Sequence, residues 1–113
     1  MNKIINKLRR FNADRDWDKF HSPKNLVMAL MVEVAELAEI MMWKTQDETR
    51  DLMRGLERNK IFDEIGDILI YAIILADRFN INIEDVINRK ITLNSRKYPV
   101  EMAKGSNKKY SEL

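Results

Sequence analysis

Four acidic side chains interrupt stretches of the chain that are otherwise apolar. Glu33 and Glu36 stand three residues apart within residues 26–43, and Glu64 and Asp67 repeat that spacing further along. Residues three apart share one face of a helix, where a buried carboxylate without a partner is costly. We therefore predict that a cation neutralises these acids, and that the two pairs converge if their helices pack antiparallel.

The composition limits the kind of cation. The chain has no cysteine and a single histidine, His21, which excludes disulfides, thiolate zinc sites and histidine-rich metal sites. A site built from carboxylates favours a hard cation, so we expect Mg²⁺, with Mn²⁺ as a substitute. Because Mg²⁺ usually shares its coordination shell with phosphate oxygens, the acidic pairs point to polyphosphate hydrolysis or transfer.

A simpler interpretation applies to any one of these motifs. A single Glu-x-x-Glu spacing is usually a solvated helix face or one half of a salt bridge. Two copies on apolar helices favour a site over that interpretation. Glu39 is expected to be solvated or paired with a basic residue, and the role of Asp63 stays open.

Aromatic residues follow the acids at helical spacing. Trp43 comes seven residues after Glu36 and Tyr71 seven after Glu64, which returns each ring to nearly the same helix stripe as its carboxylate. Trp17 and His21, four apart in a loop before the second helix, could close a pocket for a stacked base. Core packing is the alternative role for each ring taken alone.

The elements that must position these residues are four helices, with no strand-like alternation. Ser22 and Asn82 are predicted N-caps, Pro23 a first helical residue and Pro99 a stop signal. The predicted helices span about 2–12, 23–43, 51 or later to 79, and 83–98. We expect an all-α, antiparallel four-helix bundle in a single domain, 1–113, with an irregular tail over 99–113.

Charge and hydropathy restrict the class of protein. There are 20 basic and 18 acidic residues, arranged as net +4 over 1–25, −7 over 26–87 and +5 over 88–113. Basic segments on both sides of an acidic centre suit a ligand in which an anion is bound to a cation. The weak overall charge argues against a general nucleic-acid partner. The apolar runs are too short to span a membrane, and the first residues lack the pattern of a signal peptide, so we expect a cytoplasmic protein.

Four segments together resemble a known family. They are FNADRDWDKFHSPKNL, EVAELAE leading to Trp43, DEIGDILIY and NSRKYPVEMAKGSNKKYSEL, and they cover nearly the whole chain. The sequence resembles the MazG-like all-α nucleotide pyrophosphohydrolases, most closely the dCTP pyrophosphatase branch.

The resemblance implies Mg²⁺-dependent hydrolysis of a nucleoside triphosphate to the monophosphate and pyrophosphate, in a homo-oligomer that is a dimer or a tetramer. It implies four metal ligands: Glu33, Glu36, Glu64 and Asp67. It implies seven substrate-binding residues: Trp17, His21, Trp43 and Tyr71 around the nucleotide, and Asn94, Lys97 and Tyr98 near the phosphates. Either Glu33 or Glu36 would act as the catalytic base. Leu8 stands where cytosine-selective members can place a polar residue, which predicts relaxed base selectivity.

Two other functions remain open at this point. The chain could be a non-catalytic helical interaction module, or a relative that acts on another nucleotide diphosphate bond. The nearly all-apolar second helix independently favours an oligomer, since four helices of this size cannot cover it within one subunit.

Overall fold

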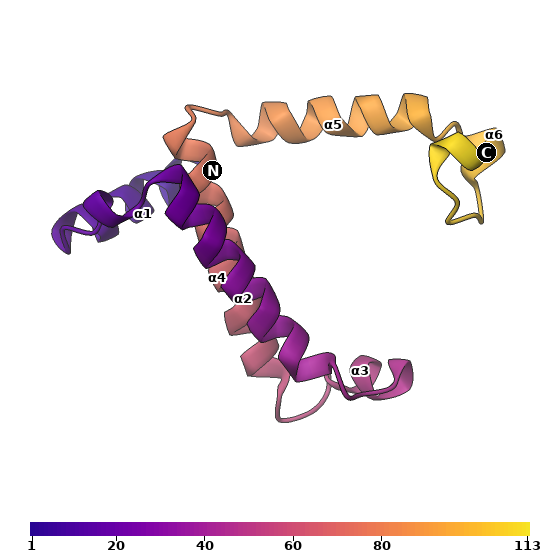
Figure 1. Cartoon of the computed structure of the whole chain (residues 1–113), viewed down its shortest axis with the longest axis horizontal. Coiled ribbons are helices and arrows are strands. Elements are labelled where there is room, and N and C mark those ends of the chain that lie inside the picture. The colour runs from indigo at the N-terminus through magenta and orange to yellow at the C-terminus, as the bar shows by residue number, and fades with distance from the viewer. The chain divides into compact units, whose positions relative to one another are not determined.

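The computed structural model describes residues 1–113 and contains helices but no strands (Figure 1), which confirms the all-α prediction. The chain divides into two compact units, Met1–Asn80 and Ile81–Leu113. The first unit holds α1 (Asn2–Asp14), the 3₁₀ turn η1 (Asp18–Phe20), α2 (Pro23–Met41), α3 (Gln46–Asp51) and α4 (Arg58–Arg78). The second holds α5 (Ile83–Lys97), α6 (Val100–Ala103) and η2 (Tyr110–Glu112). The prediction of one domain over the full chain stays a prediction.

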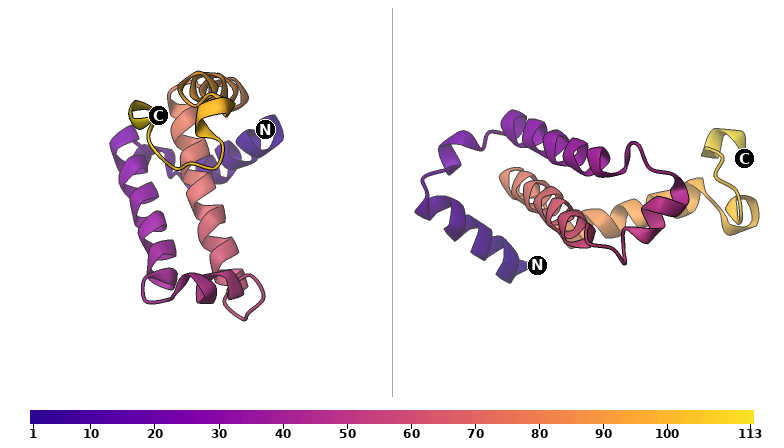
Figure 2. Two further views of the ribbon diagram at one scale, coloured as in Figure 1. Left: turned by 90° about the vertical axis from the view of Figure 1, so that its right-hand side faces the viewer. Right: turned by 90° about the horizontal axis from the view of Figure 1, so that it is seen from below.

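The long helices α2 and α4 form the centre of the first unit. They lie side by side and antiparallel, with α3 in the connection between them (Figure 2). Leu26 of α2 and Ile61 and Ile74 of α4 are buried, and α1 also packs on α4. This pairing brings the apolar stretches that contain the predicted acidic residues face to face.

The predicted caps are confirmed by hydrogen bonds. The backbone N–H of Asn25 donates to Ser22 Oγ (3.2 Å), and Pro23 is the first residue of α2. The backbone N–H of Asp85 donates to Asn82 Oδ1 (3.0 Å) at the start of α5. Each cap satisfies a backbone donor that has no partner inside the helix, and so decides where the helix begins.

Several predicted boundaries differ from the structure, and the largest differences lie before α4 and in the tail. A short helix, α3, precedes α4, and it starts with a capping box in which Thr45 and Glu48 exchange hydrogen bonds with each other's backbone. The third long helix consequently begins only at Arg58. The tail is not wholly irregular, because one α-helical turn follows Pro99 and a 3₁₀ turn lies at its end.

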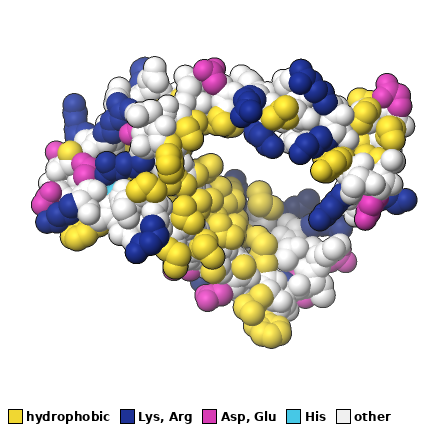
Figure 3. All heavy atoms as spheres, turned by 45° about the horizontal axis from the view of Figure 1, so that its top comes forward, with side chains coloured by type: hydrophobic (Ala, Val, Ile, Leu, Met, Phe, Trp, Pro, Cys, Tyr) yellow, Lys and Arg dark blue, Asp and Glu magenta, His cyan; other side chains and the backbone are white.

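Much of the apolar surface of α2 and α4 faces outward in this chain. Hydrophobic side chains gather over the pair in Figure 3, and Met28, Met31 and Val32 of α2 are more than half exposed. Leu69 of α4 is similarly exposed. The first unit thus contains an antiparallel helix pair with α1 beside it, and the four-helix bundle stays a prediction. None of the helices is long and apolar enough to cross a membrane.

Candidate metal and nucleotide site

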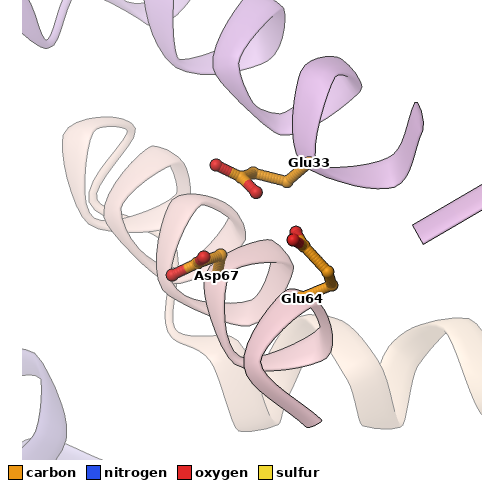
Figure 4. A group of neighbouring side chains, drawn as sticks. All are labelled: Glu33, Glu64 and Asp67. Carbon is orange, nitrogen blue, oxygen red and sulfur yellow. The ribbon is translucent and has the colours of Figure 1, made fainter. Parts of the chain in front are cut away.

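Three of the four predicted ligands converge. Glu33 points from α2 toward Glu64 and Asp67 on α4 (Figure 4), and one carboxylate oxygen from each lies within 4.8 Å of the other two. Glu64 and Asp67 lie three residues apart on the same helix face. The antiparallel pairing of α2 and α4 places Glu33 opposite that face.

The electrostatics of this acid triad, Glu33, Glu64 and Asp67, are unfavourable without a cation. Glu33 Oε2 and Glu64 Oε2 are enclosed and have no hydrogen-bond partner. Burial raises the pKa of the Glu33 carboxyl to about 7, and the neighbouring carboxyls of Glu64, Glu36 and Asp67 add to that shift. Buried oxygen atoms without a donor are the groups that a bound cation would satisfy.

The donor set fits a hard divalent ion. All three side chains offer carboxylate oxygens, and no nitrogen or sulfur ligand is among them. Oxygen-only coordination suits Mg²⁺, Mn²⁺ or Ca²⁺ and disfavours the softer transition metals. The triad therefore meets the chemical requirements for the ion predicted from the sequence.

Glu36, the fourth predicted ligand, lies outside the triad. Its carboxylate is close enough to influence Glu33, and it lines an open hollow together with Glu64, Asp63 and Lys60. Glu36 is more exposed than Glu33. The two candidate bases thus have different surroundings, since Glu33 is partly buried and Glu36 is exposed to water.

A pocket of about 270 Å³ adjoins the triad. Trp17, His21 and Tyr71 line it, and Asp67 belongs to both the pocket and the triad. The rings of His21 and Tyr71 meet edge to face with centroids 6.5 Å apart. His21 Nδ1 is enclosed there without a hydrogen-bond partner. Flat aromatic walls beside a carboxylate cluster are suited to a base linked to phosphates.

The loop that carries Trp17 is held by its neighbours. Asp16 adopts a left-handed conformation (φ 54°), which reverses the chain after α1 and is tolerated by Asp. The backbone N–H of Trp17 then donates to the carbonyl of Asn12 (3.0 Å), and its ring packs edge to face on Phe11. Arg78 of α4 donates to the Asp18 carbonyl (3.0 Å). These contacts fix one wall of the pocket to α1 and α4.

The structure does not bring Trp43 to this pocket. Trp43 lies just beyond the end of α2, is 88% exposed, and lines a separate hollow with Glu39 and Lys44. The predicted helix to residue 43 kept Trp43 on the stripe of Glu36, but α2 ends at Met41. Its role at the nucleotide stays a prediction.

The remaining predicted residues belong to the second unit. Asn94 and Lys97 lie in the last turns of α5, and Tyr98 follows directly. The ammonium of Lys97 lies 5.0 Å from the ring centroid of Tyr110, and the rings of Tyr98 and Tyr110 meet edge to face. Their proposed contact with phosphate stays a prediction.

Comparison with known proteins agrees with this arrangement. The model of the MazG-like family matches residues 28–113, which include the triad and all of the second unit. The chain belongs to the MazG-like family. Two mammalian relatives, dCTP pyrophosphatase 1 of Homo sapiens and of Bos taurus, are each 41% identical over 104 residues. The match covers 91% of this MazG-like chain but only 61% and 62% of the length of those proteins.

A solved structure shares the fold as well. The crystal structure of a pyrophosphatase from Archaeoglobus fulgidus superposes with a TM-score of 0.83 at 39% identity. The match covers 88% of this MazG-like chain and 92% of the archaeal one. The helix arrangement described above is therefore that of a known pyrophosphatase fold.

Among the pocket residues that the sequence of this MazG-like chain did not point to, Asn12 is the polar one. It is the one buried polar residue of the chain, and it lies on the same face of α1 as Ile5 and Leu8. The signal was readable, because Asn12 comes four residues after Leu8 and so continues an apolar helix face with a polar side chain.

Proposed function

We propose that this protein hydrolyses nucleoside triphosphates, with dCTP and related deoxynucleotides as substrates, to the monophosphate and pyrophosphate in nucleotide-pool housekeeping in the cytoplasm. One observation carries the proposal. Asp67 belongs both to the acid triad and to the aromatic pocket, so a cation site and a base-sized pocket share a wall. The names of the mammalian relatives and of the archaeal structure support the same activity.

In this proposal Glu33, Glu64 and Asp67 hold Mg²⁺. When bound, the ion offsets the charge of the carboxylates and of the substrate phosphates, and so favours attack by water at phosphorus. The aromatic residues Trp17 and Tyr71 position the base, and this fixes where the phosphates lie relative to the triad.

Glu36 is the better candidate for the residue that takes the proton of the attacking water. A carboxylate bound to a metal ion is a poor base, whereas Glu36 lies outside the triad and next to Glu33. The proton would pass to the Glu36 carboxylate, which is exposed and can release it to the surrounding water.

The same protein is proposed to act as a homo-oligomer, a dimer or a tetramer. Met28, Met31 and Val32 expose an apolar helix face of the kind that a subunit interface covers. Two α2–α4 pairs packed through this face would make a four-helix bundle. Trp43, exposed in one chain, would then be available to a nucleotide bound by a second copy.

Pyrophosphate release from each common NTP and dNTP tests the activity. We expect turnover with Mg²⁺ or Mn²⁺ and poor turnover with Ca²⁺, whose larger radius and looser coordination misplace the water. Asp67→Asn should abolish it without unfolding the protein. Glu39→Gln is the matched control, because Glu39 is an exposed carboxylate outside the triad.

The outcomes separate the alternatives. If the protein binds Mg²⁺ tightly but cleaves no nucleoside triphosphate, this would favour a related enzyme that acts on another nucleotide diphosphate bond. Absence of both Mg²⁺ binding and cleavage would refute the proposal in favour of a helical interaction module. An Asp67→Asn variant with wild-type activity would place the chemistry elsewhere.

A further inference from the structure

Asn12 is unusual among the residues of the first unit. The residue is only 5% exposed, although it lies on α1, a helix with a largely exposed and polar surface. Its neighbours on the inward face, Leu8 and Ile5, are apolar. A buried amide among apolar side chains is unfavourable unless its donors and acceptor find partners.

The Asn12 amide has no such partner within the protein. None of the side-chain hydrogen bonds of the chain involves the Asn12 amide, and beyond the helix itself Asn12 contributes its backbone carbonyl, which accepts from the N–H of Trp17. The side-chain polar atoms that are both enclosed and without a partner are His21 Nδ1, Glu33 Oε2 and Glu64 Oε2. Because the Asn12 amide is not among these atoms, it reaches open pocket space.

Two pockets meet at Asn12, and they differ in chemistry. One, of about 470 Å³, has its charged groups already engaged, since Arg9 pairs with Asp77 and Arg78 with Asp18. The other is the aromatic pocket of about 270 Å³ beside the triad. In that pocket His21 Nδ1 and the Asn12 amide have no hydrogen-bond partner in the protein, so a bound ligand could supply one.

We propose that the Asn12 side chain reads the hydrogen-bonding edge of the nucleobase in the aromatic pocket. This inference rests on the proposed function and adds a determinant of base specificity. A primary amide offers an acceptor and two donors in one plane, which matches adjacent donor and acceptor groups on a base edge. The rings of Trp17 and Tyr71 would contact the base, while Asn12 would contact its hydrogen-bonding edge.

A base contact from Asn12 would make the protein more selective than Leu8 alone predicts. Leu8 alone predicts relaxed selectivity, because shape without a polar contact discriminates between substrates only weakly. Asn12 stands one helical turn from Leu8 on the same pocket wall and supplies the polar group that Leu8 lacks. This protein would therefore read the base from a different turn of α1.

The test compares Asn12→Leu, which keeps the branched skeleton of the side chain but removes its polar atoms, and Asn12→Ala with the wild type. Each is assayed with Mg²⁺ against the four dNTPs and against an abasic deoxyribose triphosphate, which has no base edge. For the preferred dNTP we expect kcat/KM to fall about ten- to hundredfold in both variants, the range for losing hydrogen bonds to a desolvated partner. The abasic substrate should be cleaved at a rate within about twofold of wild type, because the same contact is absent from the start.

Equal losses with the abasic substrate, or an unchanged ranking of the four dNTPs in both variants, would overturn the proposal. Unfolding of both variants, seen by circular dichroism, would assign Asn12 a structural role and also overturn it. A wild-type protein that cleaves no nucleotide would refute the proposed function instead. In that case titration with the four deoxynucleoside monophosphates, followed by tryptophan fluorescence in a Trp43→Phe background so that Trp17 is the emitting residue, still decides whether Asn12→Leu removes a difference between bases.

Discussion

Replacement of Glu33 by glutamine tests the acid triad in the cation-free protein. The pKa of the Glu33 carboxyl is about 7 in the folded chain, against an ordinary value of 4.5, because burial and neighbouring carboxyls disfavour its charged form. Between these values the folded chain holds a proton that the unfolded chain has released. The contribution of Glu33 to stability is therefore complete below about pH 4.5 and is lost as pH rises through about 7.

The size of this effect follows from the pKa values. A difference of one pKa unit is worth about 1.4 kcal/mol. The rise in the pKa of Glu33 from 4.5 to about 7 therefore sets an upper limit of about 3 kcal/mol on the free energy of unfolding that the ionised carboxylate removes at pH 8. Water reaches part of the Glu33 side chain, which lowers the penalty. We expect Glu33→Gln to raise the free energy of unfolding by about 1 to 3 kcal/mol near pH 8 and by much less near pH 5.

Denaturant unfolding at fixed protein concentration, in the presence of a chelator, measures this difference. Glu39→Gln serves as the control, since Glu39 lies on the same helix but is exposed, and it should change little at either pH. Added Mg²⁺ should stabilise the wild type through binding to the folded state and should stabilise Glu33→Gln less. A variant that is less stable than wild type near pH 8, or equally shifted at both pH values, would refute the reasoning.

Three further changes probe other parts of the first unit. Trp43→Ala should leave the free energy of unfolding within about 0.5 kcal/mol of wild type, because the ring is 88% exposed, and should raise KM more than it lowers kcat; a large loss of stability in denaturant titrations would contradict this. Gly66→Ala should stabilise α4 by about 0.5 to 1 kcal/mol in thermal unfolding, since a Cβ there meets no atom within 4 Å, and destabilisation would reveal a second copy packed at that point. The hydrogen bond from Arg9 lowers the pKa of Asp77 below its ordinary value of 3.8. Wild type should therefore be more stable than Asp77→Asn at neutral pH, and this difference in the free energy of unfolding should disappear as pH falls below 3.8. A difference that is independent of pH would exclude this pair as its source.

The sequence alone determined the features that depend on neighbours along the chain. Ser22 and Asn82 begin their helices because their side chains accept a backbone hydrogen bond three residues on, a local geometry that the sequence encodes directly. The three-residue spacing of Glu64 and Asp67 likewise placed both on one helix face. The Thr45-x-x-Glu48 capping box that begins α3 is equally local, and the sequence encodes it in the same way.

Only the tertiary structure decided which of these residues meet. Whether Glu33 or Glu36 joins Glu64 and Asp67 depends on how α2 is rotated about its axis against α4, and spacing along one helix carries no information about that rotation. The ending of α2 at Met41 separated Trp43 from the aromatic pocket. Asn12 became a pocket residue because α1 packs on α4, a contact between segments about sixty residues apart in the sequence. Local hydrogen bonds can be read from neighbouring residues, whereas convergence of side chains from different helices is decided when apolar faces pack together.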